Sequence, residues 1–219
     1  KALTKTNEFK NQSAIIIGGS RGLGEVTAKL LASGSAKIML SYNQGLADAQ
    51  NIVNDINKNG EEASYFQYNV LSKKNNSLAK VLKNFSPTHL YYFATPFIFS
   101  GSRASFSDEL YKVFYEYYVS AFKHILNILI DTGLEKVFYP SSIALYDKPP
   151  DMKEYVSAKL SGENLCDNFK KKHNTLKIYK PRLPRVETDQ TVSLFSVLNK
   201  DPLPIQLKHL RIFRDYNEI

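Results

Sequence analysis

The chain has 219 residues, enough to bury a sizeable core, and this length predicts one domain. A hydrophobic fraction of 43% and a charged fraction of 23% exclude a disordered or low-complexity chain over most of the length. The formal net charge of +8 comes from basic residues scattered along the sequence, which is typical of a solvated surface and leaves attraction to an anionic ligand or acidic partner open.

Short runs rich in β-branched and aromatic residues alternate with longer amphipathic stretches. In chain order, the first half predicts a strand at 14–18, a helix at 22–33, a strand at 37–42, a helix at 46–58, a strand at 63–68 and a short helix at 77–85. The second half predicts a strand at 89–94, a long helix from a Ser107 cap to Asp131, a strand at 136–141, a helix at 152–172 and a strand at 176–180.

This alternation predicts βαβ units, and therefore a doubly wound parallel sheet with helices on both faces. We expect a Rossmann-like three-layer α/β/α fold in a single domain at 13–219, preceded by a polar segment or linker at 1–12. After Pro181 the pattern weakens to a short helix near Val192–Asn199 and a last strand near His209–Phe213. The region that would cover a substrate is therefore expected to be short.

A glycine-rich loop follows the first predicted strand and opens the first helix. Gly18 would permit the tight turn, Gly22 would let the backbone approach a pyrophosphate, and Gly24 would let the helix pack close to the sheet. The free N–H groups of the helix N-terminus favour phosphate, so we predict a dinucleotide site, with an ordinary glycine turn as the alternative. The loop consists of Gly18, Gly19, Ser20, Arg21, Gly22, Leu23 and Gly24.

Charge near this loop favours NADP(H) over NAD. An NAD-selective site places a carboxylate at the end of the second strand, but that end carries Ser41 and Asn43, and the first acid is Asp48. The guanidinium of Arg21 would hold a 2′-phosphate, with neutral hydrogen bonds from Ser41 and Asn43.

Tyr155 and Lys159 lie on one face of a predicted helix, four residues apart. Such a pair arises easily by chance, so its position carries the argument: it is the only Tyr-x-x-x-Lys in the chain and begins the helix after the fifth strand. Ser142 precedes Tyr155 by 13 residues, at the carboxyl end of that strand, where ligand crevices form in open α/β sheets.

The glycine loop, Ser142 and the Tyr155/Lys159 pair, in this order, resemble the short-chain dehydrogenase/reductase family over about residues 13–191. Ala94 keeps one position of the family's Asn-Asn-Ala-Gly motif at the adenine ribose. Asn69-Val70 resembles the family's Asp-Val pair that contacts adenine. Pro181 and Thr188 resemble the segment that closes over the nicotinamide.

The resemblance implies an NADP(H)-dependent oxidoreductase that interconverts a carbonyl and an alcohol by hydride transfer. Tyr155 would be the acid/base, with its pKa pulled down from about 10 by the Lys159 ammonium together with the positive nicotinamide ring. Ser142 would orient the substrate oxygen, and Lys159 would also bind the nicotinamide ribose. Gly18-Gly19 also resembles ketoreductase domains, which suggests a carrier-bound acyl or other bulky keto substrate.

Three departures from the family pattern keep a second hypothesis open. Tyr92-Phe93-Ala94-Thr95 stands where the family has Asn-Asn-Ala-Gly, and the family's catalytic Asn in the long helix has no match at 116–120. The region after Thr188 is short, so the substrate-covering helices of the family must be reduced; Arg182 also stands where the family has a glycine after Pro181. The alternative is therefore a catalytically inactive cofactor-binding or scaffolding domain of a larger biosynthetic protein.

The single cysteine, the absence of a long apolar stretch and the first residue bear on location rather than on catalysis. A single cysteine, Cys166, excludes an internal disulfide, fits a reducing compartment and is read as a packing residue. With no stretch near the roughly 18 apolar residues of a membrane span and no signal peptide, we expect a cytoplasmic protein without membrane contact. Since the chain does not begin with Met, a processed protein and a domain of a longer polypeptide both stay open.

Two expectations concern partners. The aromatic residues of the long helix predict core packing or a subunit interface, and the resemblance implies a homo-oligomer, a dimer or tetramer. These aromatic residues are too poorly interleaved with basic ones for a nucleic-acid platform, so no nucleic-acid partner is expected. We expect no metal site either, since the four histidines lack ligand spacing and are read as surface or capping residues: His89, His124, His173 and His209.

Overall fold

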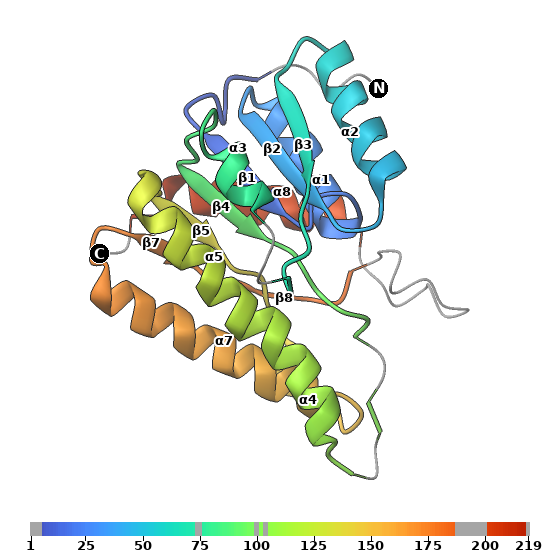
Figure 1. Ribbon diagram of the computed structural model, residues 1–219. Coiled ribbons are helices and arrows are strands. Elements are labelled where there is room, and N and C mark those ends of the chain that lie inside the picture. The colour runs from blue at the N-terminus through green and yellow to red at the C-terminus, as the bar shows by residue number, and fades with distance from the viewer. Residues whose placement is uncertain (1–5, 73–75, 99–100, 103–104, 187–200, 218–219) are drawn as a thin grey trace.

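A six-stranded parallel sheet forms the centre of the computed structural model, which describes residues 6–72, 76–98, 101–102, 105–186 and 201–217 (Figure 1). Its strand order is β3-β2-β1-β4-β5-β7, so the direction of winding reverses between β1 and β4. The predicted doubly wound fold is confirmed. The strands are β1 (Ser13–Ile17), β2 (Lys37–Tyr42), β3 (Ala63–Gln67), β4 (His89–Tyr92), β5 (Lys136–Phe138) and β7 (Lys177–Tyr179).

Helices cover both faces of the sheet, as Figure 1 shows. Those predicted at 22–33 and 46–58 have these bounds, and the helix predicted at 152–172 begins one residue later. The helices are α1 (Gly22–Ser33), α2 (Leu46–Lys58), α3 (Ser77–Val81), α4 (Asp108–Tyr115), α5 (Phe122–Leu129), α6 (Ala144–Asp147), α7 (Lys153–Lys172) and α8 (Pro202–Asp215).

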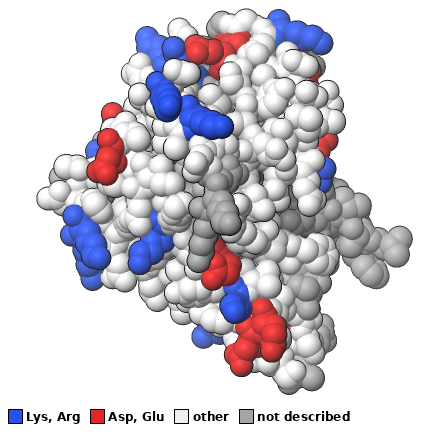
Figure 2. Space-filling view, viewed as in Figure 1, with Lys and Arg blue, Asp and Glu red and all other residues white. Residues whose placement is uncertain are grey.

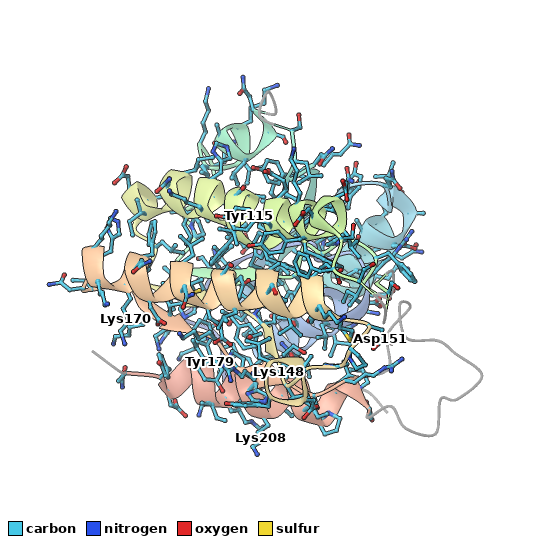
Figure 3. The ribbon with its side chains drawn as sticks, turned by 90° about the horizontal axis from the view of Figure 1, so that it is seen from below. Tyr115, Lys148, Asp151, Lys170, Tyr179 and Lys208 are labelled. Carbon is cyan, nitrogen blue, oxygen red and sulfur yellow. The ribbon has the colours of Figure 1, made fainter. Side chains whose placement is uncertain are left out.

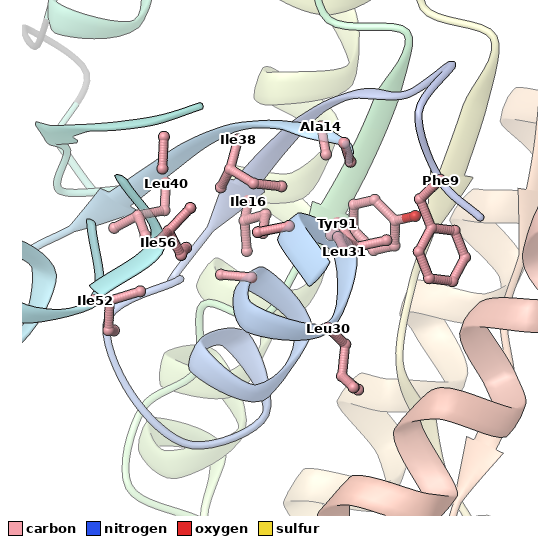
Figure 4. Packing of buried hydrophobic residues seen from close by; sticks show 14 of the residues in the cluster. Phe9, Ala14, Ile16, Leu30, Leu31, Ile38, Leu40, Ile52, Ile56 and Tyr91 are labelled. Atoms are coloured by element: carbon pink, nitrogen blue, oxygen red, sulfur yellow. The ribbon is translucent and has the colours of Figure 1, made fainter. Parts of the chain in front are cut away.

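Alternate residues of β1 serve two separate cores, as expected for a strand buried on both faces. Ala14 and Ile16 pack with α1, α2 and α8, a cluster shown in Figure 4. Ile15 and Ile17 face the opposite side, where α3, α5 and α7 supply the apolar side chains. The first core backs the glycine loop, and the second backs the Tyr155/Lys159 helix.

The strand predicted at 136–141 is divided in two. β5 ends at Phe138, and Ser141–Ser142 forms a separate strand, β6, paired in parallel with β8 (Arg182–Leu183). Pro140 stands between them, and a proline has no N–H to donate to the sheet ladder. The chain therefore steps out of the main sheet just before Ser142.

The long helix predicted from Ser107 to Asp131 is not regular throughout. Ser107 caps α4 as predicted, accepting a hydrogen bond from Leu110 N at 3.2 Å. Between α4 and α5 the residues Glu116–Ala121 form a π-helical segment, and the last turn is 3₁₀. Hydrophobic spacing alone gives no signal for such a change of pitch.

The strand predicted at His209–Phe213 is wrong, because these residues belong to helix α8. The Asp201 carboxylate accepts from Leu203 N at 2.9 Å and caps this helix, with Pro202 in its first turn. Burial follows helical spacing, through Gln206, Leu210 and Phe213. The helix predicted at Val192–Asn199 lies outside the described residues.

Two observations concern residues that were expected at the periphery. Within the predicted polar segment at 1–12, Phe9 is buried against the domain, and Gln12 Oε1 accepts a hydrogen bond from the Tyr91 hydroxyl at 2.7 Å. The reading of His89 as a surface or capping residue is wrong. It is buried, lies edge-on to Phe213 and forms a 2.8 Å hydrogen bond to the Thr88 hydroxyl.

Among the residues that the structure describes, no helix is long and apolar enough to span a membrane. Within the same residues, no group of three His, Cys, Asp or Glu side chains is arranged to hold a metal ion.

Candidate active site

The glycine-rich loop turns from β1 into α1 against the end of β4. Gly18 has φ of 79°, and a Cβ there would lie 2.8 Å from Ala94 N, so neither the backbone conformation nor the space admits a side chain. α1 begins at Gly22 with no side-chain cap, which leaves its first N–H groups available to a ligand. Ser20, Gly22, Leu23 and Gly24 of the predicted set lie in this loop or in the first turn of α1.

Ser41 holds the glycine-rich loop through two hydrogen bonds. It is buried, its hydroxyl accepts from Gly18 N at 3.0 Å, and its carbonyl accepts from Gly19 N at 2.9 Å. The sequence suggested a direct neutral contact to a ligand, whereas the geometry shows a residue that fixes the loop. Asn43 is exposed nearby, and its carbonyl accepts from Gln67 Nε2 at 3.2 Å.

Arg21 is paired with Asp48, a contact that sequence reasoning missed. Arg21 Nε donates to Asp48 Oδ2 at 2.6 Å, with both side chains largely exposed. Asp48 does not directly follow β2, but it lies in the first turn of α2, which begins after the turn at Gly45 and brings its carboxylate to the loop. A cavity of about 180 Å³ lies here, lined by Ser20, Arg21, Glu25, Lys29, Asp48, Asn51, Ile52 and Asp55.

Charge around this cavity is mixed. Lys29 forms ion pairs with Glu25 at 2.7 Å and with Asp55 at 4.0 Å. On the face drawn in Figure 2, basic side chains likewise occur in small groups separated by acidic and uncharged surface. Any anion that enters the cavity must therefore compete with carboxylates for Arg21 and Lys29.

The other predicted cofactor residues follow the ends of strands. Asn69 and Val70 come after β3, where Asn69 Oδ1 accepts from Leu71 N at 3.0 Å. Ala94 follows β4 and lies against Gly18. Pro181 is buried between β7 and β8, and its carbonyl accepts from Ser141 N at 2.8 Å. Thr188 lies outside the described residues.

Ser142, Tyr155 and Lys159 converge from two elements. β6 carries Ser142, and α7 carries Tyr155 and Lys159 one turn apart. The Ser142 hydroxyl forms a hydrogen bond with the Tyr155 phenol and accepts from Ala144 N at 3.2 Å. Lys159 Nζ lies 6.0 Å from the centre of the Tyr155 ring and donates to the Pro140 carbonyl at 2.6 Å.

Burial controls the protonation of this pair. Burial raises the pKa of Tyr155 to about 12, opposed by its hydrogen bond with Ser142. The expected lowering of the Tyr155 pKa by Lys159 is therefore not found in the protein alone. Burial likewise lowers the pKa of Lys159 to about 7, although Cys166 and Glu163 favour its ammonium form.

The residues that depart from the family pattern form hydrogen bonds with their neighbours in the site. Thr95 and Tyr118, the second from the π-helical segment, share a 2.5 Å hydrogen bond between hydroxyls. The Tyr92 hydroxyl donates to the Tyr117 carbonyl at 2.6 Å. Arg182 donates to Glu163 of α7 at 2.9 and 2.7 Å, while the Ser141 hydroxyl donates to the same carboxylate at 2.5 Å. Sequence reasoning missed Glu163; its place one helical turn beyond Lys159 was the available signal.

A chain of contacts connects the glycine loop to Ser142, Tyr155 and Lys159. Gly18 lies against Ala94, the next residue Thr95 is bonded to Tyr118, and the Tyr118 ring faces Lys159 at 4.0 Å. The three features that the sequence singled out therefore belong to one continuous site at the carboxyl end of the sheet.

The family model described as short chain dehydrogenase matches residues 12–180. A 3-oxoacyl-(acyl-carrier-protein) reductase from Synechocystis sp. (strain ATCC 27184 / PCC 6803 / Kazusa) is 41% identical over 59 residues. That match covers 27% of this chain and about a quarter of the reductase, 24%.

Several solved structures share the fold. FolM alternative dihydrofolate reductase 1 from Brucella canis, complexed with NADP, superposes with a TM-score of 0.81 at 14% identity, over 98% of this chain and 91% of that one. A short chain dehydrogenase from Burkholderia cenocepacia J2315, in complex with NADP, gives 0.80 at 17% identity, over 96% and 95%. The angucycline C-6 ketoreductase LanV with bound NADP gives 0.80 at 16% identity, over 96% and 93%.

Proposed function

The chain belongs to the short chain dehydrogenase family, and from that premise we propose that it is an NADP(H)-dependent oxidoreductase that interconverts a carbonyl and an alcohol. One observation carries the proposal: Ser142, Tyr155 and Lys159 converge beside a glycine-rich loop that opens a helix. Structural relatives named as NADP complexes support the choice of cofactor.

The residues present fit a phosphorylated dinucleotide. The uncapped N-terminus of α1 offers N–H groups to a pyrophosphate, and Arg21 borders a cavity where a further phosphate would compete with Asp48 for its guanidinium. Asn43, Asn69, Val70 and Ala94 line the expected path of the adenosine half, and Pro181 and Lys159 the nicotinamide half. Bound NADPH would supply the hydride, and the protein supplies orientation and the proton.

Tyr155 would deliver that proton. With a pKa of about 12 it is protonated at neutral pH, as a general acid must be at the start of a reduction. Its O–H would donate to the substrate oxygen as that oxygen gains charge, while the Ser142 hydroxyl orients the same atom. The Lys159 ammonium would bind ribose hydroxyls and stabilise the phenolate that remains after proton transfer.

For the substrate we propose a carrier-bound acyl ketone or another bulky ketone. Support comes from the name of the Synechocystis relative, over a short match, and from the ketoreductase among the structural neighbours. Carbonyl reduction with β-ketoacyl thioesters tests this, against small ketones of equal reactivity.

The activity test separates the two hypotheses. NADPH and NADH are titrated by nicotinamide fluorescence, and turnover is then compared between the unaltered protein and Tyr155→Phe. Absence of binding for both cofactors would refute the oxidoreductase proposal. Binding of NADPH without turnover of any ketone would favour the scaffolding alternative.

We also propose that the protein self-associates in the cytoplasm. α4 and α7 pack side by side (Figure 3), and each carries exposed apolar residues. Val113 is 45% exposed, Tyr115 37% and Leu160 47%, an apolar set of the kind that subunit interfaces bury. Light scattering after size exclusion tests the proposal, with Leu160→Glu expected to shift the protein toward the monomer. The free buried thiol of Cys166 is compatible with a reducing compartment.

A further inference from the structure

Lys159 is buried without a carboxylate partner. Its ammonium donates to the Pro140 carbonyl at 2.6 Å, and among the residues that the structure describes no salt bridge joins it to an acid. A buried ammonium pays a desolvation cost that one neutral hydrogen bond offsets only in part. Glu163 and Cys166 favour the charged form without bonding to Lys159, and its aromatic surroundings add a further contribution.

Three tyrosine rings surround the ammonium. Lys159 Nζ lies 4.0 Å from the ring centre of Tyr118, 5.0 Å from that of Tyr139 and 6.0 Å from that of Tyr155. A cation within about 6 Å of an aromatic face is attracted by the negative face of the ring, more strongly when water is excluded. Tyr118 is the nearest ring, and it is fully buried.

Tyr118 acts on Lys159 through its ring alone, since its phenol is neutral. Burial, with smaller contributions from Tyr155 and other tyrosines, raises the pKa of Tyr118 well above its usual value, so no phenolate pairs with the ammonium. The hydroxyl points elsewhere, to Thr95 at 2.5 Å. Ring and hydroxyl therefore have separate partners.

The backbone around Tyr118 is built to hold that ring in place. Tyr118 lies in the π-helical segment, where carbonyls are released from the regular helical pattern. The Tyr139 hydroxyl donates to the Tyr118 carbonyl at 3.2 Å. Gly162 of α7 leaves the room for this contact, because a Cβ there would collide with the Tyr139 hydroxyl.

The same ring also holds the acid. Tyr118 and Tyr155 meet edge to face with ring centres 5.7 Å apart, and Phe114 contacts Tyr155 in the same way at 5.8 Å. Tyr118 thus touches both members of the Tyr155/Lys159 pair.

We propose that Tyr118 is a positioning residue for the Tyr155/Lys159 pair: its ring, held by the surrounding backbone and packing, favours the ammonium form of Lys159 and keeps it near Tyr155. This rests on the proposed function for its role in turnover, but the protonation of Lys159 is a property of the protein alone. The titratable groups around Lys159 are Tyr118 and Tyr139 from one side and Tyr155, Glu163 and Cys166 from α7.

The decisive measurement needs neither cofactor nor substrate. The pKa of Lys159 is read from the ¹³Cε shift in lysine-labelled protein, with the resonance assigned by its loss in Lys159→Arg. Tyr118→Leu removes the ring and is expected to lower the pKa of Lys159 by about one pH unit, because cation–π attraction at a desolvated site corresponds to roughly a tenfold effect. Tyr118→Phe keeps the ring and is expected to stay within about 0.3 unit of the unaltered protein.

Tyr117→Leu is the matched control, since it makes the same change one residue earlier in the segment and should leave the Lys159 pKa in place. Unfolding curves establish that each variant folds, and Tyr118→Met replaces Tyr118→Leu if the latter does not. A Lys159 pKa that is equal in Tyr118→Leu (or Tyr118→Met) and the unaltered protein would overturn the proposal.

Turnover provides a second readout. The alkaline fall of kcat/KM with rising pH should begin about one unit earlier in Tyr118→Leu than in Tyr118→Phe, because Lys159 loses its charge at lower pH. Equal alkaline limbs would contradict a role of Tyr118 in turnover. Absence of turnover in the unaltered protein would instead refute the proposed function, and would leave the result on Lys159 protonation standing.

Discussion

Arg182 of β8 donates two hydrogen bonds to the buried carboxylate of Glu163 on α7, from Nε at 2.9 Å and from a terminal nitrogen at 2.7 Å. Ser141, the residue before Ser142, donates to the same carboxylate at 2.5 Å. This fork joins the strand that carries Ser142 to the helix that carries Tyr155 and Lys159. Arg182, which stands where the family has glycine, is therefore part of the framework of the site.

We expect Arg182→Ala to destabilise the fold by about 2 kcal/mol, because it leaves the Glu163 carboxylate buried with one partner fewer. Urea unfolding at pH 7 measures this. Lys180→Ala is the matched control: it breaks the exposed ion pair to Asp167 and should cost less than about 0.5 kcal/mol. Equal effects of the two substitutions would show that the fork is no more than a surface pair.

The fork also has a defined pH dependence. Burial alone would raise the pKa of Glu163, but hydrogen bonds from Arg182 and Ser141 hold it below its usual value. A carboxyl with a depressed folded pKa stabilises the fold above its unfolded value of 4.5, and this contribution is lost as the pH falls through the folded pKa. The penalty of Arg182→Ala should therefore shrink below pH 4.5.

His89 should make the protein less stable in mild acid. Burial, together with the nearby charge of Lys136, lowers its pKa from 6.5 to about 4. Between pH 6.5 and about 4, His89 is protonated in the unfolded chain but neutral in the folded chain. Its contribution to the free energy of unfolding is therefore full above pH 6.5 and falls by up to about 3 kcal/mol as the pH drops toward 4. His89→Asn, compared with His124→Gln on the exposed side of α5, should flatten the dependence of the unfolding free energy on pH.

Tyr155→Phe should reduce kcat for carbonyl reduction by roughly 10²–10⁴-fold, because the general acid is lost, while the dissociation constant for NADPH changes little. Steady-state kinetics and fluorescence titration measure the two quantities. Tyr115→Phe, a change of the same kind on the outer surface of α4, serves as the control and should leave kcat unchanged. A Tyr155→Phe protein with full activity would remove Tyr155 from its proposed role.

Arg21 and Asp48 should affect cofactor choice in opposite directions. Arg21→Ala is expected to weaken NADPH binding about tenfold and leave NADH binding nearly unchanged, since only NADPH carries the 2′-phosphate. Asp48→Asn removes the carboxylate charge that competes for the Arg21 guanidinium, from 2.6 Å away, and should strengthen NADPH binding several-fold. Titrations of each variant with NADPH and NADH test both expectations. An NADPH dissociation constant unchanged by Arg21→Ala would mean that Arg21 does not bind the 2′-phosphate.

Much of this fold could be predicted because local pattern and global topology agree. Strand and helix periodicities alternate without interruption up to Lys180, and the glycine loop and the Tyr155/Lys159 pair are marked by their place in that alternation. His209–Phe213 misled because its alternation of polar and apolar residues mimics a strand, while Asp201 and Pro202 gave the stronger helix signal.

The contacts that could not be predicted are those made across the fold. The Arg21–Asp48 pair depends on how tightly the turn at Gly45 closes, and burial of His89 depends on where α8 packs. Tyr118, whose ring faces Lys159, lies in the segment Glu116–Ala121 where the helix changes pitch, and residue spacing does not encode such a change.

That change of pitch has a consequence for the helix as a whole. Before the π-helical segment, Phe114 packs with Tyr155; after it, Phe122, Leu126 and Leu129 pack into the core beneath the sheet. A wider turn accommodates an additional residue, and one residue rotates everything beyond it by about 100°. Glu116–Ala121 thus sets the rotation of the second half of the helix relative to the first, so that each half faces its own packing partners. Deleting a single residue there would keep the helix but rotate one half relative to the other. Either Phe114 would then lose its contact with Tyr155, or Phe122, Leu126 and Leu129 would turn away from the core.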